Sequence, residues 1–218
     1  MRGAMLNRLA RALTTRLLTP VARALLRLGV SPDAVTVVGT LGVCVGALGF
    51  YPRGELFWGT VVIALFVFSD LVDGIMARAS GRSSRWGAYL DSTMDRIADA
   101  AVFSGLVLYY AGRGDDPVIA GLALACLVLG QVVSYARARA EGLGMRADVG
   151  IAERAERLVA TLLTTGLVGL GLPDVVLLVV LALLAVASLV TVIQRMVTVR
   201  RQSQAADVDT VQGSRTDA

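Results

Sequence analysis

The sequence predicts an all-α integral membrane protein with six transmembrane helices and an N-terminal amphipathic surface helix. Hydrophobic residues make up 56% of the 218 residues and charged residues only 17%, whereas a soluble domain is about a quarter charged. The apolar residues gather in runs close to the roughly 20 residues that a membrane-spanning helix needs. Most of the arginines lie between these runs. This composition excludes an ordinary water-soluble enzyme.

The basic residues exclude several kinds of catalysis. The chain contains no histidine, and all 21 of its basic residues are arginine. A histidine base, a lysine Schiff base, a Ser-His-Asp triad and a histidine metal site are therefore excluded. Cys44 and Cys126 lie inside apolar runs without CxxC spacing, so neither a disulfide framework nor a zinc site is indicated. Any chemistry must use carboxylates, arginines, hydroxyls and backbone groups.

The first expected element is a cytoplasmic amphipathic juxtamembrane helix within residues 1–30. This segment has six arginines, no acidic residue, and leucines at helical spacing. That pattern is typical of a helix lying on an anionic membrane surface. A helix packed against the protein's own cytoplasmic face would show the same pattern, and this alternative stays open.

Six apolar spans follow, and we expect them to form one membrane domain over residues 31–200. Ser31 suits the N-cap of the first span, and Pro32 suits its first helical position. The fifth span is short and rich in Thr and Gly, and the sixth has no charge from Val175 to Val190. The expected spans are residues 33–52, 56–76, 88–111, 117–137, 157–172 and 174–196.

The loops between the spans alternate in charge. The basic segments are the N-terminus, residues 77–88, residues 137–157 and the chain after Arg195. The other loops hold only Arg53 and Arg113 beside several acidic residues. The positive-inside rule therefore predicts that both termini and the basic loops face the cytoplasm. Residues 201–218 have no apolar periodicity and are predicted to form a disordered cytoplasmic tail.

Five aspartates interrupt the second and third spans: Asp70, Asp73, Asp91, Asp95 and Asp99. An ionised side chain at the centre of a membrane helix costs about 2.5–3.5 kcal/mol on an insertion scale. We therefore expect these carboxylates to face a polar cavity that contains a counter-charge. For Asp99 we expect a hydrogen-bonded structural role.

The spacing of the other four aspartates predicts a metal site. Asp70 and Asp73 are three residues apart and share a helix face, as do Asp91 and Asp95, which are four apart. Two adjacent antiparallel helices joined by a short loop would bring the four carboxylates together. Oxygen ligands without Cys or His favour magnesium, manganese or calcium over zinc. Two such ions would act as the clamp used in phosphoryl transfer.

Glycines and arginines accompany these aspartates. Gly74 and Gly87 allow a helix or a phosphate to approach closely. Arg78, Arg82 and Arg85 add donors that suit phosphate oxygens. The second and third spans therefore indicate a site for a phosphate-bearing substrate.

These residues carry a resemblance. The stretch DLVDGIMAR, from Asp70 to Arg78, is followed after eight residues by GAYLDSTMD, from Gly87 to Asp95. This resembles the signature of the CDP-alcohol phosphotransferase family, D-x-x-D-G-x-x-A-R, eight residues, then G-x-x-x-D-x-x-x-D. All eight fixed positions match over 26 residues. The six-span layout is also similar to the fold of that family.

The resemblance implies transfer of a phosphatidyl-type group from a CDP-linked lipid to an alcohol, with release of CMP. It implies that Asp70, Asp73, Asp91 and Asp95 bind two Mg²⁺ ions, with Mn²⁺ as a possible substitute, and that Asp95 is the catalytic base. The residues implied to contact CDP-diacylglycerol are Asp33, Ala34, Val35, Thr36, Gly74, Arg78 and Ser84. A homodimer in the bacterial inner membrane, in contact with membrane lipid and with no nucleic-acid partner, is implied as well.

The 137–157 segment bears on the acceptor alcohol. Its arginines and Arg195 lie near the cytoplasmic ends of spans four to six, where they would form a cationic pocket for an acceptor that itself bears phosphate. Arginines that only mark the inner membrane edge would have the same distribution. The segment is similar to the actinobacterial phosphatidylinositol phosphate synthases of the family. That likeness implies that inositol phosphate is bound by Arg137, Arg154, Arg157 and Arg195.

Two other functions stay open. Glycerol 3-phosphate also carries a phosphate, so a phosphatidylglycerophosphate synthase is the alternative within the enzyme class. The acidic helices would also suit a divalent-cation transporter. The outer halves of the spans lack acidic residues, and this counts against a transport path across the membrane.

Overall fold

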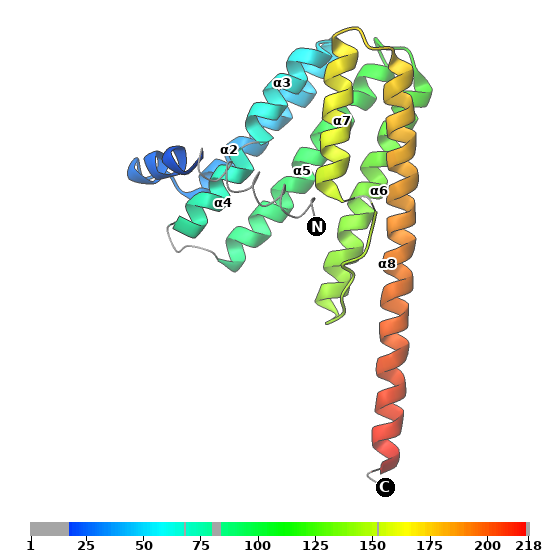
Figure 1. The fold of residues 1–218 in the computed structure, drawn as a ribbon. Coiled ribbons are helices and arrows are strands. Elements are labelled where there is room, and N and C mark those ends of the chain that lie inside the picture. Colours follow the sequence, from blue (N-terminus) through cyan, green and yellow to red (C-terminus); the bar gives the residue numbers. More distant parts are fainter. Residues whose placement is uncertain (1–17, 68, 80–83, 152, 217–218) are drawn as a thin grey trace, which may run out of the picture.

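A computed structural model describes residues 18–67, 69–79, 84–151 and 153–216, apart from the side chains of residues 70, 71 and 206–216 (Figure 1). The fold is all-helical, with 85% helix and no strand in the described part of the chain. This confirms the all-α class.

The helices form one bundle in which α5, α6, α7 and α8 run side by side (Figure 1). Helices α5 and α8 both pack against α6, α7 packs against α8 and α3, and α2 packs against α5, α4 and α3. The elements are α2 (Pro32–Cys44), the π-helix η1 (Val45–Phe50), the 3₁₀-helix η2 (Tyr51–Arg53), α3 (Leu56–Val67), α4 (Ser69–Ala79), α5 (Arg85–Tyr110), α6 (Pro117–Gly142), α7 (Arg154–Gly169) and α8 (Asp174–Thr216).

Capping residues set where several helices begin. Ser31 accepts a hydrogen bond from the Ala34 N–H at 3.2 Å, and Pro32 occupies the first turn of α2, as the sequence predicts. Ser84 caps α5 by accepting from the Gly87 N–H at 2.9 Å. These side chains satisfy backbone donors that the first helical turn leaves unpaired.

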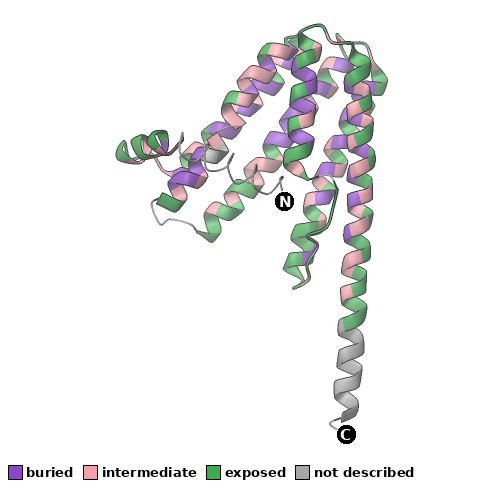
Figure 2. Cartoon of the chain, viewed as in Figure 1, coloured by how far each residue is buried: buried purple, intermediate pink, exposed green. Residues whose placement is uncertain are grey.

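The side chains of the bundle are distributed as in a membrane protein. A buried core that includes Tyr51, Ile63, Phe103 and Leu181 lies between the helices, and buried residues face inward along each helix (Figure 2). Large apolar side chains are also exposed on the outside, among them Leu183, which is 65% exposed. An apolar exterior over an apolar core indicates a protein that lies in lipid.

In the described part of the chain, four helical segments are long and apolar enough to cross a membrane: Pro32–Arg53, Leu56–Ala79, Pro117–Gly142 and Asp174–Ala205. They correspond to the first, second, fourth and sixth predicted spans. Helix α5 has the required length, but its N-terminal part carries Asp91, Asp95, Arg96 and Asp99. Helix α7 has only 16 residues. The structure therefore supports a multi-pass membrane protein without confirming the count of six.

The N-terminal segment is described only from residue 18. A helix over residues 18–27 lies across the ends of α2 and α4 (Figure 1). Its Ala22 is buried with Ile75 and Met76 of α4, while Arg23 and Arg27 are exposed. This half of the segment thus packs against the protein itself, the alternative that the sequence left open. Residues 1–17 lie outside the described residues, and placement on a membrane surface stays a prediction.

The C-terminal segment differs from the disordered tail predicted for residues 201–218. Helix α8 continues without interruption to Thr216. Gln202 holds the loop that precedes α7, because its Oε1 accepts from the Arg146 N–H at 2.9 Å and its Nε2 donates to the Arg146 carbonyl. The sequence from Arg201 to Val211 contains neither Gly nor Pro, so a helix begun in the membrane can propagate through it. Apolar periodicity reports burial and therefore does not detect this extension.

Helix α5 approaches η1 closely at Gly105. A Cβ atom added to Gly105 would lie 2.5 Å from the Ala47 carbonyl oxygen and 3.0 Å from its carbonyl carbon. Neither atom belongs to a side chain that could move aside. The absence of a side chain at Gly105 is therefore a condition for this helix contact.

We expect Gly105→Ala to destabilise the bundle by about 1–3 kcal/mol, because it overpacks a contact between two backbones. The measurement is the Tm of the detergent-solubilised protein. Gly121→Ala on α6 is the matched control, since an added Cβ there meets nothing within 4 Å. Equal Tm values for the two variants would contradict the close approach of α5 and η1.

Candidate functional site

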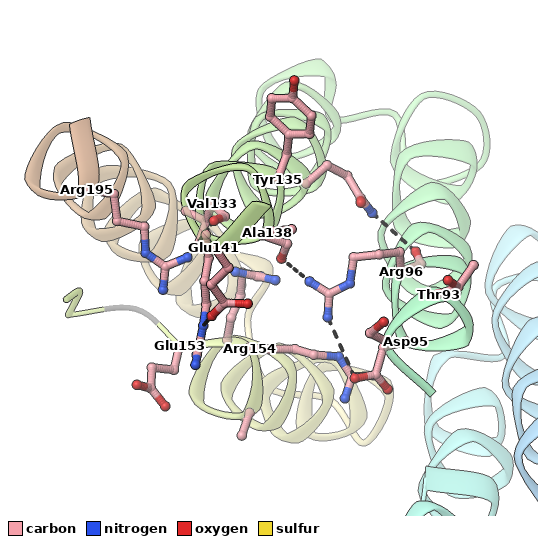
Figure 3. Close-up of a pocket in the computed structure, with 16 residues that line it drawn as sticks. Thr93, Asp95, Arg96, Val133, Tyr135, Ala138, Glu141, Glu153, Arg154 and Arg195 are labelled. Atoms are coloured by element: carbon pink, nitrogen blue, oxygen red, sulfur yellow. Dashed lines mark hydrogen bonds and ion pairs between the residues drawn. The ribbon is translucent and has the colours of Figure 1, made fainter. Parts of the chain in front are cut away.

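A cavity of about 840 Å³ lies among α5, α6, α7 and α8 (Figure 3). Most of its polar wall comes from guanidinium, carboxylate, amide and hydroxyl groups. The residues that line it are Ser92, Thr93, Asp95, Arg96, Gln131, Val133, Ser134, Tyr135, Arg137, Ala138, Glu141, Glu153, Arg154, Ala155, Arg157 and Arg195.

The four arginines predicted to bind the acceptor all line this cavity. Arg137 belongs to α6, Arg154 and Arg157 to α7, and Arg195 to α8. Three helices thus bring to one place residues that are up to 58 positions apart in the chain. An arginine that only marked the membrane edge would not need to face such a cavity.

These arginines differ in burial and in partners. Arg195 is buried, and its Nε donates to the Val149 carbonyl at 3.0 Å and its Nη1 to the Val133 carbonyl. Arg137 is half exposed and pairs with Glu141 at 2.9 Å and with Asp148 at 3.0 Å. Arg195 is therefore held rigidly by backbone oxygens, whereas Arg137 is held by carboxylates near the solvent.

Asp99 is the buried carboxylate beneath the cavity. It is 3% exposed, and it accepts from Arg154 Nε at 3.1 Å and from Arg157 Nη2 at 3.2 Å. Arg96 Nη2 lies 3.7 Å from it. This is the hydrogen-bonded structural role expected for Asp99. Three guanidinium groups around one carboxylate leave the floor of the cavity with excess positive charge, which favours an anionic ligand.

Asp95 lies at the edge of the same cavity (Figure 3). Its Oδ1 pairs with Arg154 Nη2 at 3.0 Å, and its Oδ2 lies 3.8 Å from Arg96 Nη2. The side chain is 21% exposed, so a molecule in the cavity could reach it. The predicted catalytic base therefore borders the space that the predicted acceptor arginines enclose.

The other predicted metal ligands are less completely defined. Asp73 is buried, and its Oδ2 accepts from Thr36 Oγ1 at 2.5 Å. Asp91 is exposed, and the Asp70 side chain lies outside the described residues. Among the side chains that are described, no three or more Cys, Asp or Glu gather as a metal site. The aspartate quartet therefore stays a prediction.

Helix α2 lies against both α4 and α5. Helix α2 thus joins the two helices that carry the predicted metal ligands. The reason is a set of contacts made by α2, in which Thr36 bonds to Asp73 of α4 and Asp33 accepts from Trp86 Nε1 of α5 at 3.1 Å.

The residues predicted to contact CDP-diacylglycerol lie around the start of α2, the C-terminal half of α4 and the start of α5. An added Cβ at Gly87 would lie 3.4 Å from Ser84 Oγ and 3.9 Å from Asp33 Oδ1. A Cβ at Gly74 would lie 3.6 Å from Arg78 Nη1, so the exposed Arg78 side chain folds back over Gly74. The three helix segments thus form a neighbourhood of small and polar residues.

Two of the predicted CDP contacts, Val35 and Ala34, already use their side chain or their N–H within the protein. The Val35 side chain packs against the apolar cluster of Ala22, Val72, Ile75 and Met76, so only its backbone is available to a ligand. Ala34 is exposed, and its N–H is already bonded to Ser31.

Arg96 was missed by the sequence analysis. Its Nη1 donates to Ser134 Oγ of α6, and the side chain lines the cavity. An arginine within an apolar span, next to Asp95 and three residues before Asp99, is the signal that would have identified it, because a buried cation requires nearby anions.

The fold and the site define a class: a helical membrane protein with an arginine-lined cavity next to carboxylates of a phosphotransferase-type motif. A sequence profile described as CDP-alcohol phosphatidyltransferase matches residues 29–193. The chain belongs to the CDP-alcohol phosphatidyltransferase family, an enzyme family, as the motif indicated.

Similar proteins within this family share a more specific description. The phosphatidylinositol phosphate synthase of Streptomyces avermitilis is 60% identical over 213 residues, covering 95% of this chain and 87% of the relative. The phosphatidylinositol phosphate synthase of Cutibacterium acnes is 48% identical over 198 residues, covering 88% and 96%.

Solved structures agree with this similarity. The Mycobacterium tuberculosis phosphatidylinositol phosphate synthase with CDP-DAG bound is 46% identical, with a TM-score of 0.81 over 84% of this chain and 94% of that one. The same enzyme in complex with manganese and citrate gives a TM-score of 0.80 at 46% identity, over 84% of this chain and 88% of that one.

We expect Asp99→Asn to lower the Tm of the solubilised protein strongly. The substitution keeps the side-chain volume but leaves the 2%-exposed Arg157 without its carboxylate partner, and breaking a buried pair costs about 3–5 kcal/mol. Asp115→Asn is the control, because Asp115 is exposed and has a φ of 45°, which asparagine tolerates. An unchanged Tm for Asp99→Asn would show that the cavity does not depend on this carboxylate.

Proposed function

We propose that this enzyme transfers the phosphatidyl group of CDP-diacylglycerol to inositol phosphate, giving phosphatidylinositol phosphate and CMP. The observation that carries the proposal is the convergence of four arginines from three helices in a cavity that Asp95 borders. A phosphate group on the acceptor would bind to the guanidinium groups, since these suit phosphate oxygens in charge and shape. The acceptor would then have its hydroxyl groups near Asp95.

The similar proteins support this acceptor. The Streptomyces avermitilis and Cutibacterium acnes relatives are both described as phosphatidylinositol phosphate synthases, and this chain aligns with nearly the whole length of each. The Mycobacterium tuberculosis synthase binds CDP-DAG in one structure and manganese with citrate in another. Citrate, like inositol phosphate, is a polyanion with hydroxyl functionality.

The residues present fit a divalent metal by their chemistry. The candidate ligands Asp70, Asp73, Asp91 and Asp95 offer only carboxylate oxygens, which Mg²⁺ and Mn²⁺ prefer. The burial of Asp73 at 6% exposure beside Thr36 keeps one of them oriented. We propose that these four aspartates hold two Mg²⁺ ions, with Mn²⁺ as an alternative. When bound, the ions would neutralise the charge on the diphosphate and on the departing CMP.

The protein's own residues supply the acid–base and positioning chemistry. Asp95 accepts the proton of the acceptor hydroxyl as the hydroxyl oxygen bonds to the β-phosphorus of CDP-diacylglycerol and the bond from that phosphorus to CMP breaks. Arg154 lies 3.0 Å from Asp95 and orients its carboxylate for this role. Arg157 and Arg195, held in place by Asp99 and by backbone carbonyls, keep the acceptor phosphate beside that base.

The nucleotide end of the lipid substrate would bind between the starts of α2 and α5 and the C-terminal half of α4. We propose that the stretch from Asp33 to Thr36, with Gly74, Arg78 and Ser84, contacts the CDP group. The exposed Arg78 guanidinium is available for phosphate, and Gly74 beneath it leaves room for close approach. Asp95 would then lie between the nucleotide and the acceptor.

The membrane arrangement follows from charge. We propose six spans, with α5 and α7 crossing the membrane beside the four segments that meet the length and hydropathy criteria, since both run along them in the bundle (Figure 1). The basic loops predict that the cavity and both termini face the cytoplasm of a bacterial inner membrane. The acyl chains would stay in the bilayer, and the enzyme would act as a homodimer.

An acceptor comparison tests the function. Purified enzyme with CDP-diacylglycerol and Mg²⁺ should release CMP with inositol phosphate and form phosphatidylinositol phosphate, because the phosphate of the acceptor matches the arginine cavity. The measurement is product formation with radiolabelled inositol phosphate, inositol and glycerol 3-phosphate in parallel. Product from glycerol 3-phosphate alone would show a phosphatidylglycerophosphate synthase instead. Ion flux in proteoliposomes without CMP release would show a transporter.

A second experiment tests the base. Asp95→Asn should lower kcat by at least about 10²-fold, the contribution typical of a general base, while binding of CDP-diacylglycerol is largely kept. Turnover is measured as CMP release, and lipid binding is measured separately. The exposed Asp115→Asn variant should have wild-type turnover. If Asp95→Asn also turned over at the wild-type rate, another group would have to accept the proton.

A further inference from the structure

The guanidinium group of Arg157 lies directly against the backbone of α6 at Gly130. A Cβ atom added to Gly130 would lie 2.8 Å from Arg157 Cζ, 2.9 Å from its Nη2 and 3.0 Å from its Nε. Atoms of a side chain essentially never approach a Cβ this closely, so the guanidinium occupies the space that any other residue at 130 would need.

The arginine has little room to move away. Arg157 is only 2% exposed, and it is the largest fully buried side chain among the described residues. Its Nη2 donates to Asp99 Oδ2 at 3.2 Å. A shift large enough to admit a methyl group at position 130 would lengthen this charge-assisted bond in a buried site, where such bonds are strong.

One nitrogen donor of the Arg157 guanidinium is not used in these contacts. Arg157 Nη1 is buried and has no hydrogen-bond partner among the described residues, and the side chain lines the cavity. A buried guanidinium nitrogen without a partner is costly unless a ligand supplies an acceptor. Gly130 and Asp99 thus hold the Arg157 guanidinium from two sides. Its Nη1 is left to donate to a molecule in the cavity.

The surface of α6 around Gly130 consists of small residues that leave room for this contact. Gly130, Ser134 and Ala138 are small residues four apart and therefore lie along one face of the helix. Ser134 Oγ donates to the Gly130 carbonyl at 3.0 Å and accepts from Arg96 Nη1. Two guanidinium groups therefore lie on this face, and Gly130 supports the one that is more deeply buried.

We propose that Gly130 is a positioning residue of the acceptor cavity, required because only glycine lets the Arg157 guanidinium lie against α6 with Nη1 directed to an acceptor phosphate. This inference rests on the proposed role of the cavity in binding the phosphorylated acceptor. Glycine is disfavoured relative to alanine in the interior of a helix, and Gly130 lies in the middle of the 26-residue helix α6. The contact with Arg157 accounts for its presence there.

The test is a double-mutant cycle on the purified full-length enzyme. Gly130→Ala should raise the KM for inositol phosphate by about tenfold or more, the effect of a lost hydrogen bond to a charged group, with the KM for CDP-diacylglycerol within about twofold of wild type. In the Arg157→Ala background the same substitution should cause no further rise, because Gly130 acts through Arg157. Gly121→Ala, where an added Cβ meets nothing, should leave both KM values unchanged.

Several results would overturn the inference. An equal rise in both KM values, or the same effect of Gly130→Ala with and without Arg157, would mean that the glycine serves general packing of α6. Unchanged constants in Gly130→Ala would mean that Arg157 needs no such space. If Gly130→Ala does not fold, Tm measurements decide: folding restored by Arg157→Ala supports the inference, and failure in both backgrounds overturns it.

Failure of the proposed function would be recognised separately. If the proposed function is wrong, the wild-type enzyme forms no product from inositol phosphate. If only the present inference is wrong, the wild-type enzyme is active, and Gly130→Ala has the same effect with and without Arg157. Should the wild-type enzyme use glycerol 3-phosphate instead, the same variants measured with that acceptor test the coupling in the same way.

Discussion

The ion pairs of Asp99 are the interaction on which the candidate site depends. A charged group inside a membrane bundle is tolerated only with partners of opposite charge, and Asp99 on α5 supplies that partner to Arg154 and Arg157 on α7. The pairs join two helices that both line the cavity. Because one carboxylate faces three guanidinium groups, the pairing stabilises the arginines and still leaves positive charge for a ligand.

On another wall of the cavity, Arg195 is positioned by backbone oxygens rather than by a charged partner. Arg195 on α8 donates to carbonyls of Val133 and Val149, and Gln202 further along α8 holds Arg146. The C-terminal part of α8 thus supports the loop between α6 and α7. This loop, also contacted by Arg137 through Asp148, borders the side from which a water-soluble acceptor would enter.

The site combines two neighbourhoods with different chemistry. The starts of α2 and α5 and the C-terminal half of α4 bring together glycines, hydroxyls and short polar contacts such as Thr36 with Asp73, which suit close approach of a nucleotide diphosphate. The cavity among α5 to α8 is dominated by guanidinium groups, which suit a phosphorylated acceptor. Asp95 belongs to the sequence motif of the nucleotide neighbourhood, and its ion pair with Arg154 links it to the arginine-lined cavity. A base at this boundary can act on one substrate while the other is held beside it.

The sequence by itself determined the all-α membrane class and the family motif from Asp70 to Asp95, because composition and short-range spacing are properties of the chain alone. The four arginines that the resemblance implied for the acceptor all line one cavity in the structure. Only the tertiary structure decided that α2 lies against both α4 and α5, that Arg96 joins the cavity and that Gly130 supports Arg157. These features depend on contacts between residues far apart in sequence, and the residue types involved are common in membrane helices. The helical course of α8 to Thr216 was missed for a related reason, since a polar helix has no apolar pattern to reveal it.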